Sequence, residues 1–229
     1  MISTARLLLA LSLLASVVSA QARRPFVRAS GEATVSATPD VVTVTLSVVS
    51  QGATAQEAAE NNAAATTRVI NALKQLVGVK GDVKTVGYSV FPVQRTTNGV
   101  TAIAFYQASN TVQITADDLN LGGRIIDTGA QAGATNISGI SFGLKDYAPA
   151  RRQALQQAAA RAKVNAEAMA AGLNARVGAV VSVEESSAVR AFTDARFASG
   201  GAAGVATPTP IEAGLVTVSA SVVLEADLT

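Results

Sequence analysis

The most informative feature of this sequence is what it lacks. Its 229 residues include no cysteine, no histidine and no tryptophan. Without cysteine the chain has no disulfide, no thiol nucleophile and no thiolate metal site. Without histidine it has no imidazole base, which excludes the usual serine and cysteine triads. Because cysteine and histidine are the ligands that zinc prefers, a zinc site is also not expected. The composition therefore favours a protein that is not an enzyme and that holds no cofactor or metal.

Charge is also scarce and nearly balanced. Lysine and arginine total 18 against 16 aspartate and glutamate, a formal charge of +2, and charged residues make up 15% of the chain. A typical globular protein has about 25%. The sequence has no basic stripe interleaved with aromatic residues, so we expect no nucleic-acid partner. A chain of this length can bury a sufficient core without disulfides or metals.

The first twenty residues have the pattern of a secretory signal peptide. Arg6 precedes the apolar run "LLLALSLLASVV", and the small residues of "VSA" come directly before Gln21. This pattern predicts export with cleavage before Gln21. The apolar run is shorter than the roughly 20 residues that a membrane-spanning helix needs. We therefore predict a cleaved signal peptide over 1–20, a mobile lead-in over 21–29 and a single domain over 30–229.

The domain begins with two strand patterns. Small apolar and polar residues alternate from Glu32 to Ala37, and β-branched and hydroxyl residues alternate from Val42 to Val48. A period of two is typical of strands with one buried face. Pro39, between the two patterns, has no amide for a sheet ladder and belongs at a turn or an edge.

Three later stretches have a helical period. Thr54 and Glu57 form a capping box that opens the first helix. Asp117 or Asp118 can cap the N-terminus of the second helix. The third helix is expected to have one apolar face. The predicted helices span 54–77, 119–131 and 149–173, and the face of the third comprises Leu155, Ala158, Ala162, Met169 and Leu173.

The remaining patterns complete an α+β fold. Strands are predicted over 83–93 and 102–116, joined at an Asn98-Gly99 hairpin turn, and again over 135–144, over 177–183 and from about Gly214. The Gly-, Ala- and Pro-rich stretch at about 192–210 is predicted to be a flexible loop. The order is roughly ββαββαβαββ, a mixed, mostly antiparallel sheet with about three helices packed against it.

Three segments resemble, in order, the signatures of the SIMPL-domain family. They are "SGEATVSATPDVVTVTLSV", the stretch from "FYQASNTVQITADDLNLGG" to "ISGISFGL", and "ARRQALQQAAARAKVNAEAMAAGLNARVGAVVSVEE". The resemblance covers Ser30 to Glu225. It implies an exported bacterial envelope protein of the group that includes the periplasmic immunogenic proteins. Members form oligomers, some of them channel-like, and are linked to oxidative-stress tolerance. The family has no agreed catalytic residues, so the resemblance assigns no active site.

Two groups of side chains are candidates for binding. The first is aromatic, and packing within the core or an interface is its default interpretation, with a ligand cleft as the alternative. The second is a basic stretch on the third helix, either a solvated face or a contact for an acidic partner or anionic lipid. The groups are Tyr88, Phe91, Phe105 and Tyr106, and Arg151, Arg152, Arg161 and Lys163.

Catalytic and metal-binding patterns are weak. Asp117, Asp118 and Asp127 could bind a hard cation, but paired carboxylates before a helix more often interact with its free amides. Ser141 and Lys145 are four residues apart, a spacing that is common by chance. The sequence contains no P-loop, since "GGR" at 122–124 lies inside a helical pattern.

These observations favour one hypothesis over two rivals. The first is a non-enzymatic, homo-oligomeric envelope protein, periplasmic or outer-membrane associated, that acts through assembly and surface contacts in oxidative or envelope stress protection. Its partners would be copies of itself and an envelope or membrane surface. The alternative is a periplasmic module that binds a small molecule or peptide in an aromatic-lined cleft. A hydrolase using carboxylates or a Ser-Lys pair is the least favoured, because histidine and cysteine are missing.

Overall fold

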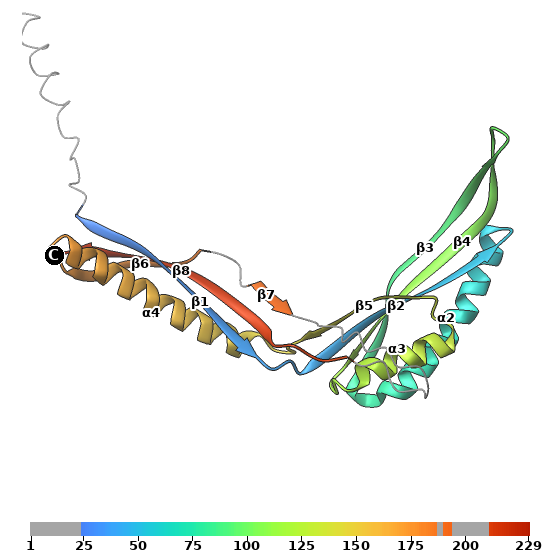
Figure 1. Cartoon of the computed structure of the whole chain (residues 1–229), viewed down its shortest axis with the longest axis horizontal. Helices are drawn as coiled ribbons and strands as arrows, with labels where there is room; N and C mark the ends of the chain where they lie inside the picture. The colour runs from blue at the N-terminus through green and yellow to red at the C-terminus, as the bar shows by residue number, and fades with distance from the viewer. Residues whose placement is uncertain (1–23, 187–189, 194–210) are drawn as a thin grey trace, which may run out of the picture.

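The protein consists of two sheets joined end to end. The computed structural model describes residues 24–186, 190–193 and 211–229. The molecule is elongated, with one sheet and its helices in each half (Figure 1). Within these residues both sheets have four strands and every pairing is antiparallel. The α+β class is confirmed, and the single sheet expected from the sequence is replaced by two.

The first sheet is built around the C-terminal strand. β8 pairs with β1 on one side, from Phe26 opposite Asp227 to Ala37 opposite Val216, and with β6 and β7 on the other. The alternation in β1 and β8 buries one face under a single helix and leaves the other face polar. The elements are β1 (Phe26–Ala37), β6 (Val177–Glu185), β7 (Arg190–Thr193), β8 (Val216–Leu228) and the helix α4 (Ala148–Gly172).

The residues of helix α4 that are buried against this sheet are all alanines. They recur at every fourth position: Ala150, Ala154, Ala158, Ala162, Ala166 and Ala170. An i, i+4 stripe drifts around a helix of 3.6 residues per turn, so it follows strands that twist beneath it. The small side chains bring the helix backbone close to β1. The apolar face expected for this helix is wrong in part, because Met169 and Leu173 are exposed.

The second sheet has the order β3-β4-β2-β5. Its central strands bury Val42, Val44 and Leu46 against two helices, as their alternation predicted. The strands are β2 (Val41–Gly52), β3 (Gly81–Thr97), β4 (Val100–Ala116) and β5 (Asn136–Gly143), and the helices are α2 (Ala55–Val77), the 3-10 turn η1 (Gly78–Lys80) and α3 (Leu121–Ala132).

Helix α2 begins as the capping box predicted. Thr54 Oγ1 accepts a hydrogen bond from the Glu57 amide (3.1 Å), and Glu57 Oε2 accepts one from the Ala53 amide (2.8 Å). Further along, the fully buried Asn62 points at the sheet, where its Nδ2 donates to the carbonyl oxygens of Val48 (2.8 Å) and Ala108 (3.2 Å). A polar side chain therefore joins the helix to two strands within the core.

Strands β3 and β4 form a long hairpin that projects from the second sheet (Figure 1). Its turn is the predicted Asn98-Gly99, both in the left-handed region with φ of 52° and 79°. β2 ends at Gly52, opposite Tyr106, so the hairpin beyond that point is a two-stranded ribbon. Among the described residues, no third strand pairs with this ribbon.

The boundaries of several elements differ from expectation. The strand order matches except that β7 is added. β1 begins at Phe26, inside the predicted lead-in over 21–29, and α3 begins two residues later than expected. Phe192 and Thr193 belong to β7, and the rest of the predicted loop lies outside the described residues, as does the predicted signal peptide over 1–20. None of the helices in the described part of the chain is long and apolar enough to cross a membrane.

Candidate functional site: the groove between β1 and α4

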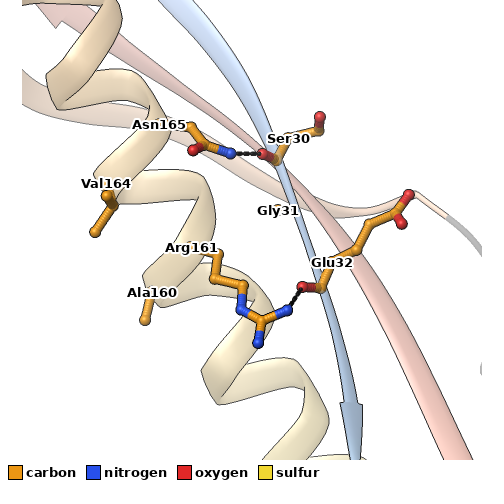
Figure 2. Close-up of a pocket in the computed structure, with 7 residues that line it drawn as sticks. All are labelled: Ser30, Gly31, Glu32, Ala160, Arg161, Val164 and Asn165. Carbon is orange, nitrogen blue, oxygen red and sulfur yellow. Dashed lines mark hydrogen bonds between the residues drawn. The ribbon is translucent and has the colours of Figure 1, made fainter.

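A depression of about 460 Å³ follows the free edge of β1 beside α4 (Figure 2). Gly31 forms its floor, and Ala160, Arg161, Val164 and Asn165 of α4 form its wall. The close approach of strand and helix depends on Gly31, because a Cβ there would overlap the Ala158 carbonyl oxygen and the Ala162 amide nitrogen. A glycine inside an alternating strand is the sequence signal for such an approach.

Two α4 side chains bond to the backbone of β1. Arg161 Nη1 donates to the Glu32 carbonyl oxygen (2.7 Å), and Asn165 Nδ2 donates to the Ser30 carbonyl oxygen (2.8 Å). On the side of β1 that faces β8, the Leu228 amide donates to the carbonyl oxygen of Pro25, an odd-numbered residue. Because backbone groups alternate in direction along an antiparallel strand, the even-numbered residues of β1 direct theirs to the free edge. Arg161 and Asn165 therefore cap an exposed sheet edge, which otherwise invites pairing with another strand.

The groove contains no acid–base pair. The Glu32 side chain points away from α4 in Figure 2, so its carboxylate does not face Arg161. A second depression of about 410 Å³ continues along the same edge to Arg28 and Met169 and adds one more cation. The arrangement offers hydrogen-bond donors and apolar wall atoms. It can bind or block a strand, and it presents no nucleophile positioned beside a base.

The four predicted aromatic residues do not converge on one surface. Tyr88 lies opposite Asn110, and Tyr106 opposite Pro92, so both tyrosines lie on the α2 face of the sheet. Phe91 and Phe105 point to the other face by the same alternation. Tyr88 and Phe91 are 56% and 43% exposed. The residues bracket the hairpin on both faces and do not line a single cleft.

The four predicted basic residues also point in different directions around α4. At 3.6 residues per turn, Arg151 and Arg152 lie about 100° apart, and Arg161 and Lys163 about 200° apart. Arg151 forms an ion pair with Glu185 of β6 (2.8 Å), and Lys163 lies 3.9 Å from Glu167. Arg161 donates a hydrogen bond to the backbone carbonyl oxygen of Glu32. Most of this positive charge is therefore already engaged within the protein.

Two of the predicted acidic residues, Asp117 and Asp118, lie at the junction between the two sheets, and the third, Asp127, lies within α3. Asp117 pairs with Lys145 Nζ (2.6 Å), whose own backbone amide donates to Asp40 Oδ1 (2.7 Å). Asp118 accepts from the Asn120 amide (3.0 Å) in a turn before α3, so neither aspartate is the N-cap. Within the described ranges no group of three or more acidic residues is placed to hold a metal ion.

Ser141 and Lys145, the predicted dyad, take part in different structures: Ser141 in a sheet strand and Lys145 in this junction. Ser141 lies in β5 opposite Thr43, on the polar face of the second sheet. The ammonium group of Lys145 is bound to Asp117 instead. The cluster of Asp40, Asp117 and Lys145 links three chain segments where the halves meet, a structural role that single residues in the sequence did not reveal.

Comparison with known proteins identifies the family. The SIMPL model, described as "Protein of unknown function (DUF541)", matches residues 27–226. The "26 kDa periplasmic immunogenic protein" of Brucella melitensis biotype 1 is 30% identical over 167 residues, which cover 68% of this chain and 64% of the relative. The "Uncharacterized protein YggE" of Escherichia coli strain K12 is 26% identical over 162 residues, which cover 69% and 65%. The chain thus matches just under two thirds of the length of these relatives. The match over nearly all of the predicted domain confirms the resemblance: this chain belongs to the SIMPL family.

Proposed function

We propose that this protein is exported to the periplasm and acts there by assembling with copies of itself and contacting the envelope, without catalysing a reaction. The hairpin of β3 and β4 is the observation that supports this most directly. An isolated two-stranded ribbon is only marginally stable in water. This one projects from the sheet with Val100 and Ile103 at least half exposed. Such a surface gains stability when a partner covers it.

Export is supported by two independent observations. The signal-peptide pattern ends before Gln21, and the Brucella relative is named as a periplasmic protein. We extend the proposal to association with the outer membrane and to protection against oxidative or envelope stress, the roles that the family resemblance implies. A deletion strain should then lose oxidant tolerance and regain it with the full-length gene.

Sizing of the mature chain tests the proposal. The full-length chain is expressed with its predicted signal peptide, and the mature protein is recovered from the periplasmic fraction. Its mass is then measured by size-exclusion chromatography with light scattering at micromolar concentration. We expect a mature N-terminus at Gln21 and a mass that is a multiple of the monomer. A strict monomer would contradict self-assembly, and retention in the cytoplasm would contradict export.

A further inference from the structure

The free edge of β1 offers backbone donors whose companion acceptors are already bonded. In the described part of the chain β1 pairs with β8 alone, so its other edge faces the groove beside α4. The carbonyl oxygens of Ser30 and Glu32 point to that edge, and each already accepts a hydrogen bond from α4. The amide of an edge-facing residue points the same way as its carbonyl group. The edge therefore presents the amides of Ser30 and Glu32 as donors, while the matching acceptors are occupied.

Arg161 adds a positive charge that no carboxylate balances. Its hydrogen bond goes to a neutral carbonyl oxygen, and it forms no ion pair with any residue that the structure describes. A guanidinium has five N–H donors, so several remain for a ligand. The one acid in the lining, Glu32, directs its carboxylate away from α4 (Figure 2). Arg28, near the other end of the groove, lies opposite Glu225 of β8. An anionic group is therefore drawn to the Arg161 end.

The groove has the dimensions of a short extended chain. Its two depressions, of about 460 and 410 Å³, both include Ser30 and Asn165 and follow one edge. Arg161 and Met169 lie near its two ends on α4, and eight residues of helix span about 12 Å. An extended chain covers about 3.3–3.6 Å per residue, so about three or four residues fit. The exposed side chains of Val164 (62%) and Met169 (44%) make part of the wall apolar.

From these observations we propose that the groove between β1 and α4 binds the C-terminal end of an extended peptide whose last side chain is apolar. The terminal carboxylate accepts hydrogen bonds from the Glu32 amide and the Arg161 guanidinium, and the last side chain packs against Val164. The preceding residues follow the edge toward Arg28, so the peptide runs parallel to β1. This site requires no second copy of the chain and thus goes beyond the proposed self-assembly.

The capped carbonyl oxygens select a chain terminus over a continuous strand. A strand that passes through the groove would direct its own amides at the Ser30 and Glu32 oxygens, which Asn165 and Arg161 already occupy. A terminal carboxylate has acceptors alone and needs donors alone. Hydrogen bonds between a guanidinium and a carboxylate are also stronger than those between neutral groups. The same caps that discourage strand addition are therefore compatible with a peptide end.

Isothermal titration calorimetry on the mature protein tests this site with three probes. They are N-acetyl-Ala-Ala-Ala-Val with a free carboxyl terminus, the same peptide as its C-terminal amide, and N-acetylvaline. The free-acid peptide should bind at least about tenfold more tightly than the amide, which lacks the charge that Arg161 recognises. It should also bind at least about tenfold more tightly than N-acetylvaline, which has the same carboxylate and side chain but no preceding residues to follow β1.

Variants locate the binding. Arg161→Gln should abolish the preference for the free acid over the amide, and Arg161→Lys should recover part of it, because the charge returns without the planar fork. Arg152→Gln is the matched control, since nine residues of helix place Arg152 about 180° from Arg161, and it should bind as the wild type does. Val164→Ser should weaken binding of the peptide that ends in valine several-fold and leave N-acetyl-Ala-Ala-Ala-Gly unchanged. Circular dichroism checks that each variant is folded.

The outcomes separate this inference from the proposed function. Equal affinity of the wild type for the free acid and the amide, or no binding of either, would overturn the carboxylate site. Equal affinity for N-acetylvaline would overturn the peptide as the ligand, and an equal loss in Arg152→Gln and Arg161→Gln would overturn its place in the groove. A mature chain that is monomeric and still binds the free-acid peptide would support the site and contradict self-assembly alone.

Discussion

Replacement of Gly31 by alanine tests how closely α4 approaches β1. The added Cβ would overlap the Ala158 carbonyl oxygen and the Ala162 amide nitrogen and would lie 2.9 Å from the Ala162 Cα atom. Carbon atoms pack favourably at about 3.5–4.0 Å. These obstacles belong to the helix backbone, so no side-chain rotation relieves them. The helix must move away from the strand by roughly 1 Å to restore normal contact distances.

The cost follows from the alanine stripe. A gap of about 0.5–1 Å forfeits a quarter to a half of the dispersion energy at each affected contact. Alanine side chains are too short to fill the gap from the helix side. Overpacking of this kind costs about 1–3 kcal/mol and occasionally more. For a chain of this size each kcal/mol lowers Tm by about 2–4 °C, so we expect a fall of roughly 2–12 °C.

Thermal unfolding followed by circular dichroism measures this effect. Gly139→Ala in β5 is the matched control, because an added Cβ there meets no heavy atom within 4 Å. It should change Tm by no more than about 2 °C, as an unobstructed surface substitution does. Equal Tm values for the two variants would refute the reasoning, since they would mean that strand and helix are not in backbone contact at Gly31.

Two further predictions follow from named hydrogen bonds. Asn62→Ala removes the donor to two strand carbonyls and should lower the free energy of unfolding in urea by about 1–3 kcal/mol. The same change at the exposed Asn61 should lower it by less than about 0.5 kcal/mol. Similar losses at both positions would argue against the buried hydrogen bond. Replacing Arg161 and Asn165 together with alanine uncaps β1 and should speed thioflavin-positive aggregation several-fold at nearly unchanged Tm, while Arg152→Ala should not. Aggregation as slow as that of the wild type would contradict the capping role.

Local patterns determined the elements and their buried faces. Alternation identified the inward residues of β1, β2 and β8, and Thr54, Asn98 and Gly99 marked a helix start and a hairpin turn correctly. These features depend on residues a few positions apart, where backbone geometry fixes the period. The chemistry that the absent cysteine and histidine exclude also follows from the sequence alone. Family membership also followed from the sequence, because its signatures are contiguous segments.

The partners of those elements were decided only in the tertiary structure. β1 and β2 are consecutive and similar in pattern, yet they belong to different sheets, because alternation specifies a face and not a neighbour. The third helix was expected to bury Met169 and Leu173, but close contact with the strands selected its alanines.

The candidate surfaces arise in the same way. Arg161 reaches the Glu32 carbonyl across 129 residues of sequence. Val180 and Val183 of β6 are exposed because α4 lies over the adjacent strands β1 and β8. Periodicity within one segment cannot encode which distant segment covers it, since that depends on the packing of whole elements against each other.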